Sequence, residues 1–126
     1  MADQSRLFQA GPDPFGRMWK VQFRWLQNGI TIRHADTVDV KFFVTPDGGE
    51  TEEKVIALPH PLLLEFCASR NLKLTDPLCM RIAAAHLRTM IETFEDIDKT
   101  LVTLKPEEIA AAYAGQTSGV TVPSLR

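Results

Sequence analysis

The sequence predicts an α+β domain in which a four- or five-stranded antiparallel sheet, a meander, is combined with about three helices. Apolar and polar residues alternate with period two in the first half of the chain, as half-buried strands require. Short turn-forming clusters separate these stretches. In the second half, apolar residues recur every three to four positions, which is typical of amphipathic helices. We therefore expect a sheet with a long helix packed on one of its faces.

The length of 126 residues and an apolar content of 44% are typical of a single globular domain. We expect residues 1–16, which contain several glycines and prolines, to form an N-terminal arm or loop. Residues 17–115 are expected to form the domain, and the Ser-, Thr-, Gly- and Pro-containing residues 116–126 a flexible C-terminal tail.

The first predicted strand begins at Arg17 and has an aromatic side and a polar side. Its inward side is predicted to consist of Trp19, Val21, Phe23 and Trp25, and its outward side of Lys20, Gln22 and Arg24. Asn28-Gly29 then predicts a two-residue hairpin turn, because both residues tolerate positive φ.

Three further strands are predicted, over residues 30–34, 38–44 and 51–58, and residues 101–104 are a candidate fifth strand. The second turn is Ala35-Asp36-Thr37, and Pro46-Asp47-Gly48-Gly49 forms the third.

Prolines mark the beginnings of the three predicted helices. Pro59 and Pro61 end the sheet and open the first helix. The long helix spans residues 76–97, with Thr75 or Asp76 as its cap and Pro77 in its first turn. Its apolar stripe is broad enough to predict burial against the sheet or against a second copy of the chain. Pro106 opens the last helix, which we expect Gly115 to stop.

The two cysteines, Cys67 and Cys79, fall in apolar helical stretches and are expected to be buried thiols, which suits the cytoplasm. The N-terminal residues lack the apolar run of a signal sequence, and no stretch reaches the length of a membrane span. We therefore expect a cytoplasmic protein with no membrane partner.

No nucleophile elbow, phosphate-binding loop, dinucleotide fingerprint or zinc-protease motif is present in the sequence. His34, Asp36 and Asp39 cluster near a turn, but turns favour Asp without any metal, and no second ligand cluster supports one. We assign no catalytic residue, no metal and no cofactor, and the sequence favours a protein that is not an enzyme.

His86 interrupts the apolar ladder of the long helix, four residues from both Ile82 and Met90. One hypothesis is a small-molecule or catalytic pocket between sheet and helix, with His86, Trp19 and Trp25 as its ligand-binding residues. The simpler interpretation is a buried structural histidine whose low-dielectric surroundings keep the ring neutral. The sequence favours the structural role.

Cations with an aromatic among them gather on the predicted outer side of the sheet. This candidate interaction surface consists of Lys20, Arg24, Arg33, Lys41 and Phe43. Aromatics beside Arg and Lys on a sheet can stack single-stranded bases. However, the net charge of −2 and the single exposed aromatic disfavour nucleic acid as the partner.

The absence of catalytic motifs, the broad stripe of helix 76–97 and an exposed Phe43 together favour a non-enzymatic protein-interaction domain. We expect it to act as a homodimer or as a subunit of a larger assembly. The alternatives that stay open are the pocket near His86 and, more weakly, a single-stranded nucleic-acid binder acting through the outer sheet face.

Overall fold

The computed structural model describes residues 7–29 and 37–121. Within them it contains five strands and three helices, which confirms the α+β class. In chain order the elements are β1 (Leu7–Ala10), β2 (Trp19–Gly29), β3 (Thr37–Pro46), β4 (Glu52–Pro59), α1 (His60–Arg70), α2 (Asp76–Thr93), β5 (Leu101–Thr103) and α3 (Pro106–Thr121).

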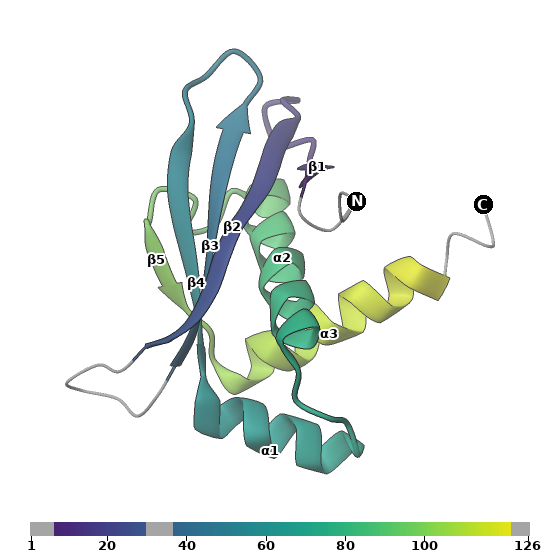
Figure 1. The fold of residues 1–126 in the computed structure, drawn as a ribbon. Helices are drawn as coiled ribbons and strands as arrows, with labels where there is room; N and C mark the ends of the chain where they lie inside the picture. Colours follow the sequence, from purple (N-terminus) through teal and green to yellow (C-terminus); the bar gives the residue numbers. More distant parts are fainter. Residues whose placement is uncertain (1–6, 30–36, 122–126) are drawn as a thin grey trace.

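All five strands form one sheet in the order β1-β2-β3-β4-β5. The first four strands pair antiparallel, which is the pairing of a meander. Of these, β2, β3 and β4 correspond to strands that the sequence predicts, whereas β1 lies in the expected arm. The fifth strand differs from the expected antiparallel sheet, because β5 pairs parallel with β4. Parallel neighbours need a long crossover, and here α1 and α2 supply it (Figure 1).

The N-terminal segment contributes a strand that the sequence analysis assigns to an arm. Residues 7–10 form β1, with Phe8 paired to Val21 and Ala10 paired to Trp19. Ala10 is buried in the core cluster and Phe8 packs against it. The short strand β1 therefore extends the apolar face of β2. Four residues are too few for an alternation of apolar and polar residues to be recognised in the sequence.

The predicted turn at Asn28-Gly29 is wrong. Both residues belong to β2, where Asn28 pairs with Val38 and Gly29 with Thr37. A turn there would end the ladder at once, whereas continued pairing satisfies the backbone groups of two further residue pairs. The predicted strand over residues 30–34, with Arg33 and His34, lies outside the described residues.

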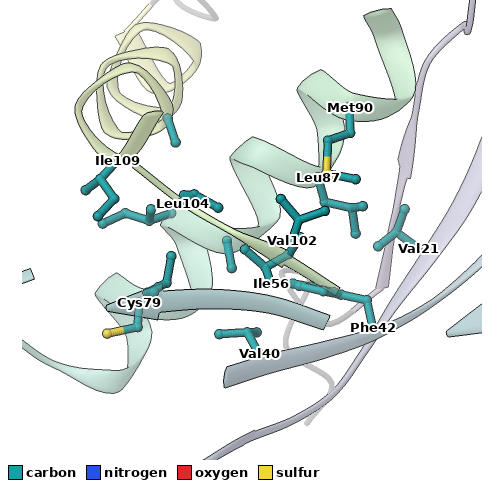
Figure 2. Packing of buried hydrophobic residues seen from close by; sticks show 14 of the residues in the cluster. Val21, Val40, Phe42, Ile56, Cys79, Leu87, Met90, Val102, Leu104 and Ile109 are labelled. Carbon is teal, nitrogen blue, oxygen red and sulfur yellow. The ribbon is translucent and has the colours of Figure 1, made fainter. Parts of the chain in front are cut away.

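The core lies between one face of the sheet and the helices, as Figure 2 shows. Strand residues with no more than 8% exposure point toward the helices from β2, β3, β4 and β5: Val21, Val40, Phe42, Ile56 and Val102. From the other side, Leu87 and Met90 of α2 and Ile109 of α3 meet them (Figure 2). We call this buried side of the sheet the inner face.

Helix α2 begins as predicted and ends earlier than predicted. The Thr75 hydroxyl accepts a hydrogen bond from the Leu78 N–H at 3.2 Å, which makes Thr75 the N-cap. The helix stops at Thr93, because Phe94 has a left-handed φ of 65°. Ile97, which we expected inside the helix, is buried in the connection to β5.

The broad apolar stripe of α2 is covered within the chain. Helix α3 crosses α2 and packs against it, with Ile109 and Ala112 buried in the same core (Figure 1). Helix α3 also continues through Gly115, the predicted stop, to Thr121 in the expected tail. A glycine inside a helix costs only about 1 kcal/mol relative to alanine, which does not by itself end one.

The opposite side of the sheet, which we call the outer face, is covered by no helix within the described residues. It is defined by Leu7, Lys20, Gln22, Arg24, Trp25, Lys41, Phe43, Glu53, Val55 and Leu101. Each of these side chains is exposed or half-buried, whereas their strand neighbours Val21, Phe42 and Ile56 are fully buried.

Candidate functional site

A β-bulge in β2 decides the composition of the outer face. The register between β2 and β3 shifts between Phe23, which pairs with Phe42, and Trp25, which pairs with Lys41. Arg24 is the extra residue, so the alternation of β2 reverses at this point. Trp25 therefore lies on the outer face, and Leu26, paired with the buried Val40, takes its place inside. The predicted inward position of Trp25 is wrong for this reason.

Cations lie over the two outer aromatic rings. The Arg24 guanidinium is 5.0 Å from the centroid of the Phe43 ring. The Lys41 ammonium is 5.4 Å from the Trp25 centroid and 5.8 Å from the Phe43 centroid. Such contacts hold the rings and the charged groups in place without burying them. We call Arg24, Trp25, Lys41 and Phe43 the aromatic–cation cluster.

A hollow of about 190 Å³ lies next to this cluster on the outer face. Its lining combines apolar walls with groups that can form hydrogen bonds: Leu7, Lys20, Gln22, Phe43, Thr45 and Thr51. The hydroxyl oxygens of Thr45 and Thr51 are 2.8 Å apart, so these two residues share a hydrogen bond across its rim. The hollow therefore places one cation and several groups that can form hydrogen bonds beside apolar side chains.

The charges of the outer face are distributed unevenly. Lys41 forms a salt bridge with Glu53 of β4 at 3.0 Å. Lys20 and Arg24, both on β2, have no acidic partner among the described residues. Asp39 lies further along β3, where it accepts a hydrogen bond from the Thr37 hydroxyl at 2.9 Å. The β2 side therefore carries unpaired positive charge, and the β4 side carries the carboxylate of Glu53.

Trp19 has a structural role on the inner face. It is 5% exposed, and its indole N–H donates a 2.9 Å hydrogen bond to Asp13. The Asp13 carboxylate also accepts from the backbone N–H groups of Phe15 and Arg17 and from the Arg17 side chain. Burial by itself would raise the pKa of Asp13, but these hydrogen bonds, that of Trp19 foremost, outweigh it and lower the pKa to about 2. Asp13 thus holds the 11–18 loop onto β2.

His86 is half-buried on α2, and the carboxylate of Glu108 on α3 is close enough to influence its charge. Burial lowers the pKa of His86 from its ordinary value, against the opposing effect of the carboxylates of Glu108, Asp96 and Glu95. It is not among the residues that line the hollow. The structure therefore does not bring all three residues together: Trp25 lies on the outer face of the sheet, whereas Trp19 lies on the inner face and His86 lies on α2, which packs against that inner face.

The predicted interaction residues, by contrast, are brought together. Lys20, Arg24, Lys41 and Phe43 all lie on the outer face, and the bulge adds Trp25 to them. Arg33 lies outside the described residues. Within the described part of the chain, no three His, Cys, Asp or Glu side chains are grouped so that they could hold a metal ion.

Lys54 is a buried charged residue that the sequence analysis does not single out. Its side chain is 2% exposed, and its ammonium donates to the carbonyl of Ile97 and, at 3.0 Å, to that of Lys99. Glu52 lies 3.4 Å away. Lys54 holds the α2–β5 connection against β4, so we interpret it as structural. The only indication of this role in the sequence is the inward position of Lys54 in the alternation of β4.

Comparison of this chain with protein-family models, with curated proteins and with solved structures gives no match. No helix in the described ranges 7–29 and 37–121 has both the length and the apolar character of a membrane span. The fold and the site therefore define the class on their own: a small α+β domain with an open sheet face that carries aromatic and cationic side chains.

Proposed function

We propose that this protein is a non-enzymatic interaction domain that binds a protein partner through the outer face of its sheet. The observation that carries the proposal is the aromatic–cation cluster on a sheet face that no described helix covers. Trp, Phe and Arg are enriched in the energetically important centres of protein interfaces. Half-buried rings held by cation–π contacts are also pre-positioned, which reduces the ordering cost of binding.

The residues around the aromatic–cation cluster are also suited to contact with a protein partner. Leu7 and Leu101, at the two edges of the sheet, are 59% and 57% exposed, and Val55 is half-buried between them. Large apolar side chains of this kind, spread over one face with a polar rim, favour an interface. Among the residues lining the hollow, no His, Asp or Glu accompanies the hydroxyl groups of Thr45 and Thr51, so the hollow lacks the histidine- or carboxylate-based pair of nucleophilic catalysis.

The small-molecule alternative receives no comparable support, because its three residues lie apart. Single-stranded nucleic acid is the second candidate, since Trp25 adds a second outer aromatic beside Phe43. Glu53 and Asp39 on the same face, and the net charge of −2, oppose it. The two buried free thiols support the proposal that the protein works in the reducing cytoplasm.

The proposal is tested by photo-crosslinking in the cells that make the protein. A benzophenone amino acid is placed at Gln22, in the middle of the outer face, and in a control at Glu92, an exposed position on α2. We expect a discrete protein adduct from Gln22 that is lost with Trp25→Ala/Phe43→Ala, and none from Glu92. Equal crosslinking from both positions, or none from Gln22, would contradict the proposed function.

A further inference from the structure

The order of the five strands about the central strand β3 bears on what can cover the outer face. Strand β3 is central, β2 and β4 flank it, and β1 and β5 form the two edges. The unpaired cations Lys20 and Arg24 lie on β2, and the carboxylate of Glu53 lies on β4. Because neighbouring strands are about 4.8 Å apart, Glu53 is roughly two strand spacings from those cations within one chain.

We propose that the occupant of the outer face is a second copy of this chain, packed face to face about a two-fold axis parallel to β3. This inference rests on the proposed function and names the partner. Such an axis places β2 of one copy over β4 of the other, and β1 over β5. Two sheets that pack with nearly aligned strands form a sandwich with a common core about 10 Å thick. The interface is isologous, with each contact made twice.

The residue register gives this arrangement complementary charges. Gln22, Phe43 and Glu53 are directly paired across the three central strands. The two-fold axis therefore puts Glu53 of the second copy over Gln22, between Lys20 and Arg24. The hollow lined by Lys20, Gln22 and the threonine hydroxyls lies at this point and receives the carboxylate. Lys20 and Arg24 thereby join the ion pair that Glu53 of the second copy makes with its own Lys41.

The apolar residues match in the same arrangement. Leu7 on β1 and Leu101 on β5 are exposed at opposite edges of the sheet. In the proposed dimer, Leu7 of one copy lies over β5 of the other, and Leu101 lies over β1. Phe43 lies on the central strand, so the two copies of this ring meet near the axis, where aromatic pairs pack favourably. Lys41 also lies near the axis, where it shares the carboxylate of Glu53 of its own chain, 3.0 Å away, with Lys20 and Arg24 of the second copy.

The other face-to-face arrangement is disfavoured by the same charges. A two-fold axis perpendicular to the strands stacks β2 on β2 and brings Lys20 and Arg24 of both copies together. Like charges placed opposite each other in an interface are costly. The positions of Lys20, Arg24 and Glu53 therefore select the axis parallel to β3.

The test is the mass of the full chain by light scattering over a hundredfold dilution in the micromolar range. We expect a mass near twice 14.1 kDa for the wild type. Arg24→Glu and Glu53→Arg should each raise the dissociation constant by roughly tenfold or more. The double variant Arg24→Glu/Glu53→Arg should recover part of that loss, because it restores opposite charges in both copies of the contact while placing a second cation beside Lys41 of the same chain. Lys73→Glu, an exposed control away from the sheet, should have no effect.

A monomer at every concentration would overturn the inference. A dimer whose dissociation constant is unchanged by Arg24→Glu and by Glu53→Arg would overturn it too, and so would a double variant that recovers none of the lost affinity. In the case of a monomer, tight binding of a fluorescein-labelled oligouridine would identify nucleic acid as the occupant. A monomer that still gives a discrete heterologous adduct from Gln22 in cells would leave the proposed function standing. Failure of both experiments would remove the proposed function as well.

Discussion

Asp13 and Lys54 are the charged side chains that the described part of the fold buries, and both bind backbone groups of connecting segments. Asp13 accepts four hydrogen bonds and fixes the loop between β1 and β2. Lys54 binds the two carbonyls that precede β5. A buried charge is tolerated when hydrogen bonds replace its lost hydration. These two residues therefore position the two edge strands of the sheet.

Asp13 should give the protein a specific sensitivity to acid. Its pKa is about 2 in the folded chain and near 3.8 when unperturbed, so the unfolded state binds this proton first as the pH falls. The stabilisation from the ionised carboxylate is complete above about pH 4 and is lost as the pH falls through 2. As the pH is lowered from 5 to 2, the urea midpoint of unfolding should fall for the wild type and change less for Asp13→Asn. An identical pH dependence of the two proteins would contradict this role.

Lys54→Met should lower the free energy of unfolding by about 2–4 kcal/mol, because the buried carbonyl of Ile97 and the partly buried carbonyl of Lys99 lose their donor. The methionine retains the length of the side chain, so the loss reports hydrogen bonding more than packing. Lys73→Met, at an exposed position between α1 and α2, is the matched control and should change stability by less than about 0.5 kcal/mol. Urea unfolding measures both, and equal effects would show that Lys54 is not an anchor.

Among the elements, strand β2 shows most clearly how one extra residue changes a surface. Phe42→Ala removes a fully buried ring from β3 and should cost about 3–5 kcal/mol in stability. Trp25→Ala removes a larger ring from the outer face and should cost less than about 2 kcal/mol. Urea unfolding at a concentration where the chain is monomeric compares the two. A larger loss of stability for Trp25→Ala than for Phe42→Ala would place Trp25 in the core and contradict the bulge in β2.

The burial of His86 on α2 should make stability depend on pH. Burial lowers the pKa of the folded-state imidazole, so the unfolded chain binds the proton more readily. The contribution of the neutral ring is complete above the unfolded value of about 6.5 and declines as the pH falls below it. Unfolding free energies between pH 5 and 8 should show this decline for the wild type but not for His86→Gln. A wild type that becomes more stable over the same fall in pH would reverse the assignment.

At the scale of the whole molecule, the two thiols report how well the core is closed. Cys67 and Cys79 are buried, and burial raises the pKa of both, that of Cys79 to about 12. Since the thiolate is the reactive form, a thiol-specific reagent should react with the native chain only as fast as the core opens. Reaction should be fast in urea. Rapid labelling of the folded protein would show that the helices separate easily from each other.

The expected elements that the structure confirms have local causes. Thr75 and Pro77 fix the start of α2, and the short apolar stretch at residues 101–104 forms β5. The candidate surface could be predicted in part, since Lys20, Arg24, Lys41 and Phe43 share the outer face. Trp25 could not be assigned to it, because a bulge depends on how the partner strand pairs. Asp13 could not be recognised either, since its donors come together only in the folded loop.

The sequence by itself determined the α+β class, the antiparallel pairing of the early strands and the inner and outer sides of β3. These follow from alternation, proline placement and capping, which act over a few neighbouring residues. Only the tertiary structure decided the direction of β5, the outward position of Trp25 and the partner of the wide stripe of α2. Those outcomes depend on which distant surface each element packs against, and the sheet together with α3 covers the stripe of α2. Burial and backbone pairing across the whole fold select among arrangements that the local patterns allow equally.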